Sequence, residues 1–189
     1  LLAFFAGCRG GTSASSGSSF PSDSRQESDS GGNVSSGGEK DMTLAENYPA
    51  DVLACVMNIL STHDTPRAIN ALLDPRDGDR AELAKRQFSQ EDLARGKELL
   101  RMAAFLQFTL PGIACIYYGD EAGMTGYRDP FNRAFFDWNS TEQRLRGPMK
   151  TLAALRRSCD AFDGGRLELI RAEGDVLHYR RVGKTQTAE

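Results

Sequence analysis

Two short, mostly apolar runs that lie far apart in the sequence constrain the fold more than any other feature. The two runs are residues 57–60 (MNIL) and 113–118 (IACIYY), and a cluster of polar residues follows each of them. This pattern is typical of short strands buried in a sheet. Helical patterns occupy the sequence between them. A strand, intervening helices and a second strand predict a parallel βαβ unit, and therefore an α/β fold.

The interval between the two runs contains two helix signals. Thr65 and Pro66 suit the N-cap and first position of a short helix that ends before Pro75. Residues 89–92 (SQED) then have the pattern of a capping box, and apolar residues recur at helical spacing as far as Pro111. The expected buried face of this longer helix comprises Leu93, Leu99, Leu100, Ala103 and Leu106.

Further elements are expected on both sides of this unit. Order is expected from about Met42, with a short helix near Pro49. A helix over residues 142–158 follows the second run, and a β-hairpin is expected over residues 166–171 and 176–182. Because a lone hairpin is marginally stable in water, it is expected to belong to a larger sheet. The expected buried stripe of the last helix comprises Leu145, Met149, Leu152, Ala153 and Leu155.

Ser and Gly dominate residues 10–40, and so polar a stretch cannot bury enough surface to offset its ordering entropy. It is expected to be a flexible linker. We therefore divide the chain into residues 1–43 (the end of a truncated helix and the linker), 44–160 (the α/β part) and 161–189 (the start of a β-domain).

Charge and cysteine content exclude several classes of function. With 23 Lys and Arg against 26 Asp and Glu, the chain lacks the excess of positive charge that attracts nucleic acid. Two histidines, and cysteines without a CxxC pair, indicate no zinc site. No apolar run approaches the roughly 20 residues that a membrane helix needs.

Residues 4–8 (FFAGC), followed by the Ser/Gly tract, allow two interpretations. They resemble a bacterial lipoprotein cleavage site, and lipidation of Cys8 would place the protein outside the cytoplasm. The alternative is the end of an amphipathic helix, which corresponds to a cytoplasmic protein. We favour the latter because no basic segment precedes the apolar residues.

The polar residues at the two strand ends are the candidate site. His63-Asp64 and Asp120-Glu121 should lie at the same edge of a parallel sheet. Carboxylates beside arginine and aromatic rings are suited to carbohydrate. Structural roles remain open on spacing alone: Asp64 as a helix N-cap, His63 as a structural histidine, and the acidic pair as partners of an arginine.

Three longer motifs carry a family resemblance. Residues 58–67 (NILSTHDTPR) resemble the last signature region of the α-amylase family of glycoside hydrolases, and residues 110–124 (LPGIACIYYGDEAGM) resemble its eighth-strand motif. Residues 127–133 (YRDPFNR), with Trp138 after them, are similar to the neopullulanase, maltogenic amylase and cyclomaltodextrinase group in particular.

This resemblance implies a fold and an activity. The fold is the carboxy-terminal part of a TIM (β/α)8 barrel, its last two βα units, followed by the start of an all-β carboxy-terminal domain. The activity is retaining hydrolysis of α-1,4 glucosidic bonds in starch-derived α-glucan oligosaccharides, with α-1,6 bonds as an additional substrate linkage that the sequence leaves open. A glucan transferase and a non-catalytic glucan-binding lipoprotein remain alternatives. A homodimer and calcium binding stay open for the parent protein, and no cofactor or metal ligand is assigned here.

The same resemblance assigns roles to individual residues. Asp64 would stabilise the transition state, and His63 would bind the same sugar. Asp129 and Arg133 would hold the next glucosyl units. The remaining residues assigned to substrate binding and to support of the barrel rim are Tyr118, Asp120 and Glu121.

Two residues essential to the family's chemistry cannot be assigned. The nucleophilic Asp and the proton-donating Glu lie on the fourth and fifth barrel strands, upstream of all three motifs. Retaining hydrolysis needs both carboxyl groups about 5–5.5 Å apart. The chain is therefore expected to be a fragment that is inactive and folds poorly alone, because part of a barrel leaves open sheet edges.

Overall fold

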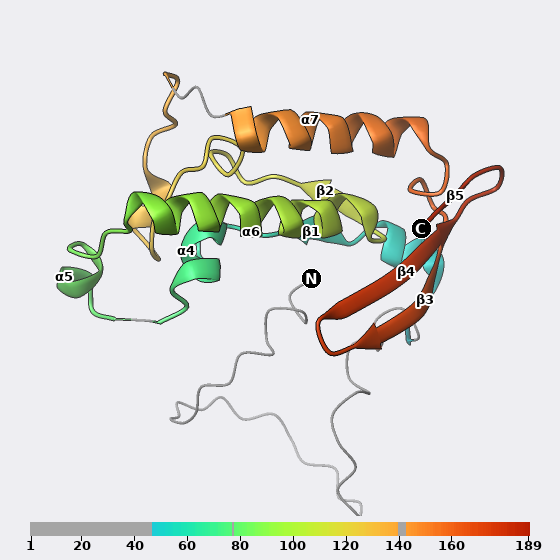
Figure 1. Cartoon of the computed structure of the whole chain (residues 1–189), viewed down its shortest axis with the longest axis horizontal. Helices are drawn as coiled ribbons and strands as arrows, with labels where there is room; N and C mark the ends of the chain where they lie inside the picture. The colour runs from blue at the N-terminus through green and yellow to red at the C-terminus, as the bar shows by residue number, and fades with distance from the viewer. Residues whose placement is uncertain (1–46, 77, 140–142) are drawn as a thin grey trace, which may run out of the picture.

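A computed structural model describes residues 47–76, 78–139 and 143–189. Predictions for residues 1–46, including the linker and Cys8, lie outside the described residues. Figure 1 shows helices α6 and α7 running alongside each other, with a separate sheet at one end. The elements are α3 (Ala50–Ala54), β1 (Met57–Ile59), α4 (Ala68–Leu73), α5 (Arg80–Leu83), α6 (Gln90–Thr109), β2 (Ile113–Cys115), the 3-10 helix η1 (Phe131–Arg133), α7 (Gln143–Ser158), β3 (Arg166–Glu173), β4 (Val176–Val182) and β5 (Thr187–Ala188).

Strands β1 and β2 form a parallel pair, which confirms the predicted βαβ arrangement. Met57 lies opposite Ile113, and Ile59 opposite Cys115. β2 ends at Cys115 and does not continue to Tyr118 as predicted, since β1 ends at Ile59 and offers no further backbone partner.

Helix α6 is the centre of the packing. Its start confirms the predicted capping box: the Ser89 hydroxyl accepts a hydrogen bond of 3.0 Å from the Asp92 N–H. α6 contacts α4 on one side and α7 on the other. The prediction that Leu155 is buried on α7 is wrong, since 42% of it is exposed. The buried cluster that joins the three helices comprises Ala68, Ile69, Leu100, Ala104, Leu145 and Met149.

Two further predictions about helices are wrong. α4 begins at Ala68 with Arg67 at its N-cap, rather than at Pro66. The Thr65 hydroxyl instead accepts a hydrogen bond of 2.9 Å from the Thr62 N–H in the preceding loop. Residues 74–88, a polar segment between the two helix signals that was expected to be a loop, contain α5, whose N-cap Asp79 accepts a bond of 2.8 Å from the Glu82 N–H.

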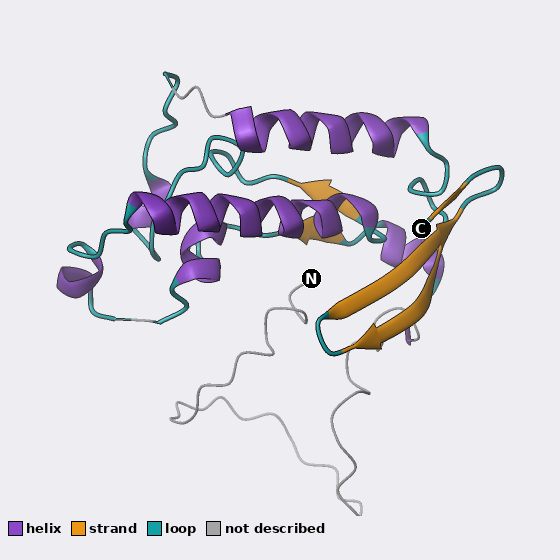
Figure 2. Ribbon diagram, in the orientation of Figure 1, coloured by secondary structure: helices purple, strands orange, loops and turns teal. Residues whose placement is uncertain are grey.

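The predicted hairpin is confirmed and belongs to a three-stranded antiparallel sheet in the order β3-β4-β5 (Figure 2). Buried Arg181 on β4 donates a hydrogen bond of 2.7 Å to the Thr109 carbonyl, at the end of α6. This contact attaches the sheet to the helical layer. None of the helices in the described ranges is long and apolar enough to cross a bilayer.

Candidate active site

The loops after β1 and β2 meet, as the parallel arrangement predicts. Asn132, in η1, is fully buried, and its side-chain NH2 donates to the carbonyls of His63 and Thr65, both at 2.8 Å. It also lies 3.3 Å from the Thr62 carbonyl. One amide group thus holds the whole turn that presents His63 and Asp64.

Asp64 carries an accessible carboxylate, with 70% of its side chain exposed. One carboxylate oxygen lies 3.1 Å from His63 Nε2, and the other lies 3.6 Å from Arg133 Nη2. The Asp64 N–H donates to the Thr62 hydroxyl at 3.1 Å. Asp64 is therefore not a helix N-cap. Its backbone is fixed within the loop while its carboxylate faces solvent between a histidine and an arginine.

Arg133 connects the two loops. Its Nε lies 2.8 Å from Asp129 Oδ1 and donates to the His63 carbonyl at 3.1 Å. The other oxygen of Asp129 lies 3.5 Å from Arg80 Nη2 on α5. The structure thus brings together four predicted site residues, His63, Asp64, Asp129 and Arg133, on one open surface. Such a group can exchange hydrogen bonds with the hydroxyls of a bound sugar.

Asp120 lies below this surface rather than on it. It is 3% exposed, and its Oδ1 lies 3.6 Å from Nη1 of the fully buried Arg67. Burial raises the pKa of Asp120 to about 6, although the Ser61 hydroxyl and Arg67 both lower it. The pair therefore acts as an internal support for the loops.

Arg67 also lies over two adjacent aromatic rings. Its guanidinium carbon lies 4.8 Å from the centre of the Tyr117 ring and 4.7 Å from that of Tyr118. It donates to the Tyr118 carbonyl, and its own N–H donates to the Gly126 carbonyl at 2.8 Å. Burial is the main cause of the raised pKa of Tyr117. Arg67 therefore holds the segment that follows β2 from its buried side.

The other two predicted residues, Tyr118 and Glu121, make hydrogen bonds to the backbone of the loop that follows β2. The Tyr118 hydroxyl donates to the Ala134 carbonyl at 2.8 Å. Glu121 Oε2 accepts a bond of 2.9 Å from the N–H of Gly119, whose φ of +89° favours glycine. With Asp120, these residues shape the rim of the site.

Sequence reasoning missed Arg67 and Asn132 as contributors to the site. Both occur inside the motifs quoted above, yet their roles depend on contacts with residues more than 50 positions away. The one available signal was Arg67 itself, a charged residue directly before an apolar helix. Within the described ranges, no three His, Cys, Asp or Glu side chains are grouped to hold a metal ion.

Comparison with known proteins identifies the family. Residues 42–161 match the family model described as "Alpha amylase, catalytic domain". The chain belongs to the α-amylase family. This α-amylase-family chain is 35% identical to an amylopullulanase from Thermoanaerobacter thermohydrosulfuricus over 74% of its length. It is 33% identical to a cyclomaltodextrinase from Geobacillus thermopakistaniensis over 77% of its length.

Solved structures show the same relationship. A cyclic α-maltosyl-(1→6)-maltose hydrolase from Arthrobacter globiformis, in complex with that cyclic sugar, is 29% identical, with a TM-score of 0.58 over 75% of the chain. A cyclomaltodextrinase structure is 30% identical, with a TM-score of 0.56 over 74% of the chain. The α-amylase-family chain spans 28% and 21% of these two proteins, and 9% and 22% of the two relatives above.

Proposed function

We propose that this chain is part of a retaining glycoside hydrolase that cleaves α-1,4 and α-1,6 glucosidic bonds of starch-derived glucans. The observation that carries the proposal is the Asp64 carboxylate, 70% exposed at a strand end between His63 and Arg133. Support comes from relatives named amylopullulanase and cyclomaltodextrinase.

Each surface residue has a role in this proposal. Asp64 accepts hydrogen bonds from sugar hydroxyls and stabilises the positive charge that develops on the sugar ring as the glycosidic bond breaks. His63 binds the same sugar unit. Arg133 and Asp129, which are paired at 2.8 Å, bind the next units. Tyr118, Asp120 and Glu121 hold the loops that carry these groups.

The proposal also assigns the architecture. The β1–β2 pair with its helices corresponds to the last two βα units of a (β/α)8 barrel, and the β3-β4-β5 sheet to the start of a carboxy-terminal β-domain. Because the nucleophile and general acid cannot be assigned in this sequence, the 189-residue chain should bind glucans without cleaving them.

Binding of maltotriose to the purified chain, measured by isothermal titration calorimetry, tests the role of Asp64. Replacing Asp64 by Asn removes a charge-assisted acceptor worth about 1.5–3 kcal/mol, so the dissociation constant should rise about 10- to 150-fold. Asp51→Asn, which changes an exposed carboxylate on α3, is the matched control.

Two results would contradict the proposal. Unchanged affinity of Asp64→Asn for maltotriose would remove Asp64 from the sugar site. Release of reducing sugar from maltoheptaose by the purified chain would show that it contains its own nucleophile and acid.

A further inference from the structure

Aromatic side chains that are exposed to solvent begin two residues after Arg133. Phe135 is 100% exposed and Trp138 is 87% exposed. Half-buried Phe136 packs its ring edge-on against Trp138, with ring centres 4.8 Å apart at 61°. The indole is thus supported from one side while most of its surface faces water. Clustered exposed rings of this kind mark a binding surface.

This aromatic segment, residues 135–138, is attached to the candidate active site. The Tyr118 hydroxyl holds the carbonyl of Ala134, the residue before Phe135, at 2.8 Å. Arg133, two residues before Phe135, contacts Asp64 and the His63 carbonyl. Since two residues of chain span at most about 7 Å, the backbone at Phe135 lies within that distance of the backbone at Arg133.

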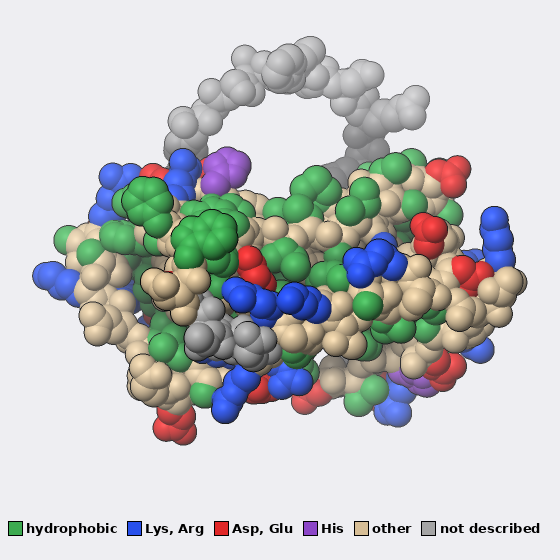
Figure 3. Space-filling model, turned by 90° about the horizontal axis from the view of Figure 1, so that it is seen from above, with side chains coloured by type: hydrophobic (Ala, Val, Ile, Leu, Met, Phe, Trp, Pro, Cys, Tyr) green, Lys and Arg blue, Asp and Glu red, His purple; other side chains and the backbone are tan. Residues whose placement is uncertain are grey.

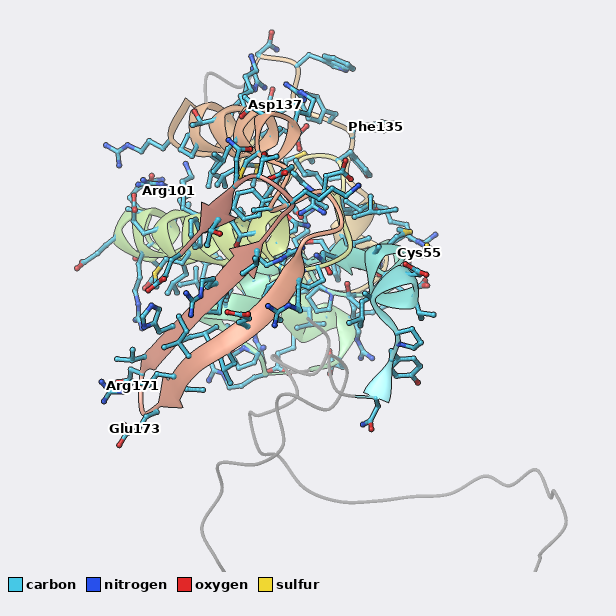
Figure 4. All side chains as sticks on the ribbon, turned by 90° about the vertical axis from the view of Figure 1, so that its right-hand side faces the viewer. Cys55, Arg101, Phe135, Asp137, Arg171 and Glu173 are labelled. Carbon is cyan, nitrogen blue, oxygen red and sulfur yellow. The ribbon has the colours of Figure 1, made fainter. Side chains whose placement is uncertain are left out.

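The views of the molecule agree with this placement. Figure 4 shows Phe135 and Asp137 on the same part of the molecule, away from Arg171 and Glu173 on the β3–β4 hairpin. In Figure 3, large hydrophobic side chains lie on the surface close to a histidine and to basic side chains. Arg133, which contacts Asp64, and Ala134, which is held by Tyr118, connect the aromatic segment to the polar group of Asp64.

We propose that Phe135 and Trp138 form an outer glucan subsite, which binds glucosyl units beyond those held at Asp64 and Arg133. The proposal rests on the proposed function and adds a preference for longer α-glucan chains. A pyranose ring presents an apolar face of C–H groups that stacks on an aromatic ring. Its rim of hydroxyls suits the neighbouring charged groups of Arg133 and Asp137.

A glucan fits this surface better than a second protein does. One polar residue divides the aromatic segment: Asp137 lies between Phe136 and Trp138, and its carboxylate accepts a bond of 3.0 Å from the Asn139 N–H. Separate ring faces divided by polar groups match successive sugar units, whereas the core of a protein interface is depleted of charged residues.

Trp138 provides the measurement, because it is the chain's one tryptophan and lies in the proposed subsite. Fluorescence of the full chain should change on titration with maltoheptaose and saturate at lower concentration than with maltotriose. Phe135→Ala should raise the dissociation constant for maltoheptaose about tenfold, which corresponds to about 1.4 kcal/mol. Its affinity for maltotriose should change much less.

Phe105→Ala is the matched control, since Phe105 is a half-exposed phenylalanine on α6. It should leave both affinities unchanged, and far-UV circular dichroism should confirm that each variant keeps the helix content of the wild type. Calorimetry on Trp138→Ala, which lacks the reporter, should give the same selective loss for maltoheptaose.

The outcomes separate this proposal from the proposed function. If Asp64→Asn weakens maltotriose binding while Phe135→Ala leaves maltoheptaose binding unchanged, the sugar site stands and the outer subsite is wrong. If neither sugar binds, both are wrong. A Trp138 signal that depends on protein concentration and not on sugar would make this surface a self-association contact and also overturn the subsite.

Discussion

Depth below the surface separates the roles of Asp64 and Asp120, which follow neighbouring strands. Asp64 is mostly exposed, with one carboxylate oxygen beside His63 and the other beside Arg133. Asp120 is buried against Arg67, and two nitrogens of that guanidinium have no hydrogen-bond partner. A ligand can reach only the first carboxylate. Asp120 instead affects the stability of the folded chain, because its burial favours the protonated form of its carboxyl group.

Asp120 should make the stability of the chain depend on pH. Its pKa of about 6 in the folded chain exceeds the 3.8 of an exposed group, so the folded state binds this proton more tightly. The resulting stabilisation is complete below about pH 4 and is lost as the pH rises through 6. Relative to Asp120→Asn, the wild type should lose up to about 3 kcal/mol of unfolding free energy between pH 4 and 7.

Urea denaturation at several pH values measures this difference. Asp51→Asn, at an exposed position on α3, is the control. Parallel pH profiles for the wild type and Asp120→Asn would show that burial of Asp120 does not govern its titration.

At the scale of elements, a reciprocal pair of amides joins α6 to both parallel strands. The Gln107 side chain donates to the carbonyls of Asn58 on β1 and Cys115 on β2, at 2.9 and 2.8 Å. The Asn58 side chain donates in return to the Gln107 carbonyl at 3.2 Å and to the Pro111 carbonyl at 2.9 Å. Both side chains are buried, so none of these bonds is readily replaced by water.

Gln107→Leu should therefore be strongly destabilising. It leaves two carbonyl groups, one buried and one part-buried, without this donor. Each costs about 1–3 kcal/mol, so the unfolding free energy should fall by about 2–6 kcal/mol. Thermal and urea unfolding measure the change. Arg95→Gln, at an exposed position of the same helix, should stay within about 0.5 kcal/mol of the wild type. Equal stability of both variants would rule out the amide pair as the main link.

The elements that could be predicted are those whose sequence signal lies within the element itself. The capping box at Ser89 predicted the start of α6, and apolar runs predicted β1 and β2. α5 was missed because its four residues are too few to show a period. The start of α4 was misplaced because Thr65 bonds within the loop. Family motifs located the candidate site residues, but the sequence could not show that Asp120 would lie underneath.

For the whole molecule, the two faces of the β1–β2 pair are unequal. Asn58 faces α6, whereas Met57 and Ile113, which lie opposite each other, point to the other face. They are 56% and 54% exposed, and within the described ranges neither strand has a second neighbour. A parallel sheet is normally covered on both faces. The similar Arthrobacter globiformis hydrolase is several times longer than the part that this chain matches.

This uncovered face should make the purified 189-residue chain self-associate. Burying a large apolar side chain contributes about 1.5–3 kcal/mol, so the double variant Met57→Gln/Ile113→Gln should weaken self-association by at least about tenfold. Sedimentation velocity over a range of concentrations measures this, and binding of a hydrophobic dye should fall in parallel. Met102→Gln changes a side chain that is 68% exposed on α6 and should leave association unchanged. If all three proteins associate equally, their contact lies elsewhere, and the β1–β2 face is stable in water without a covering layer.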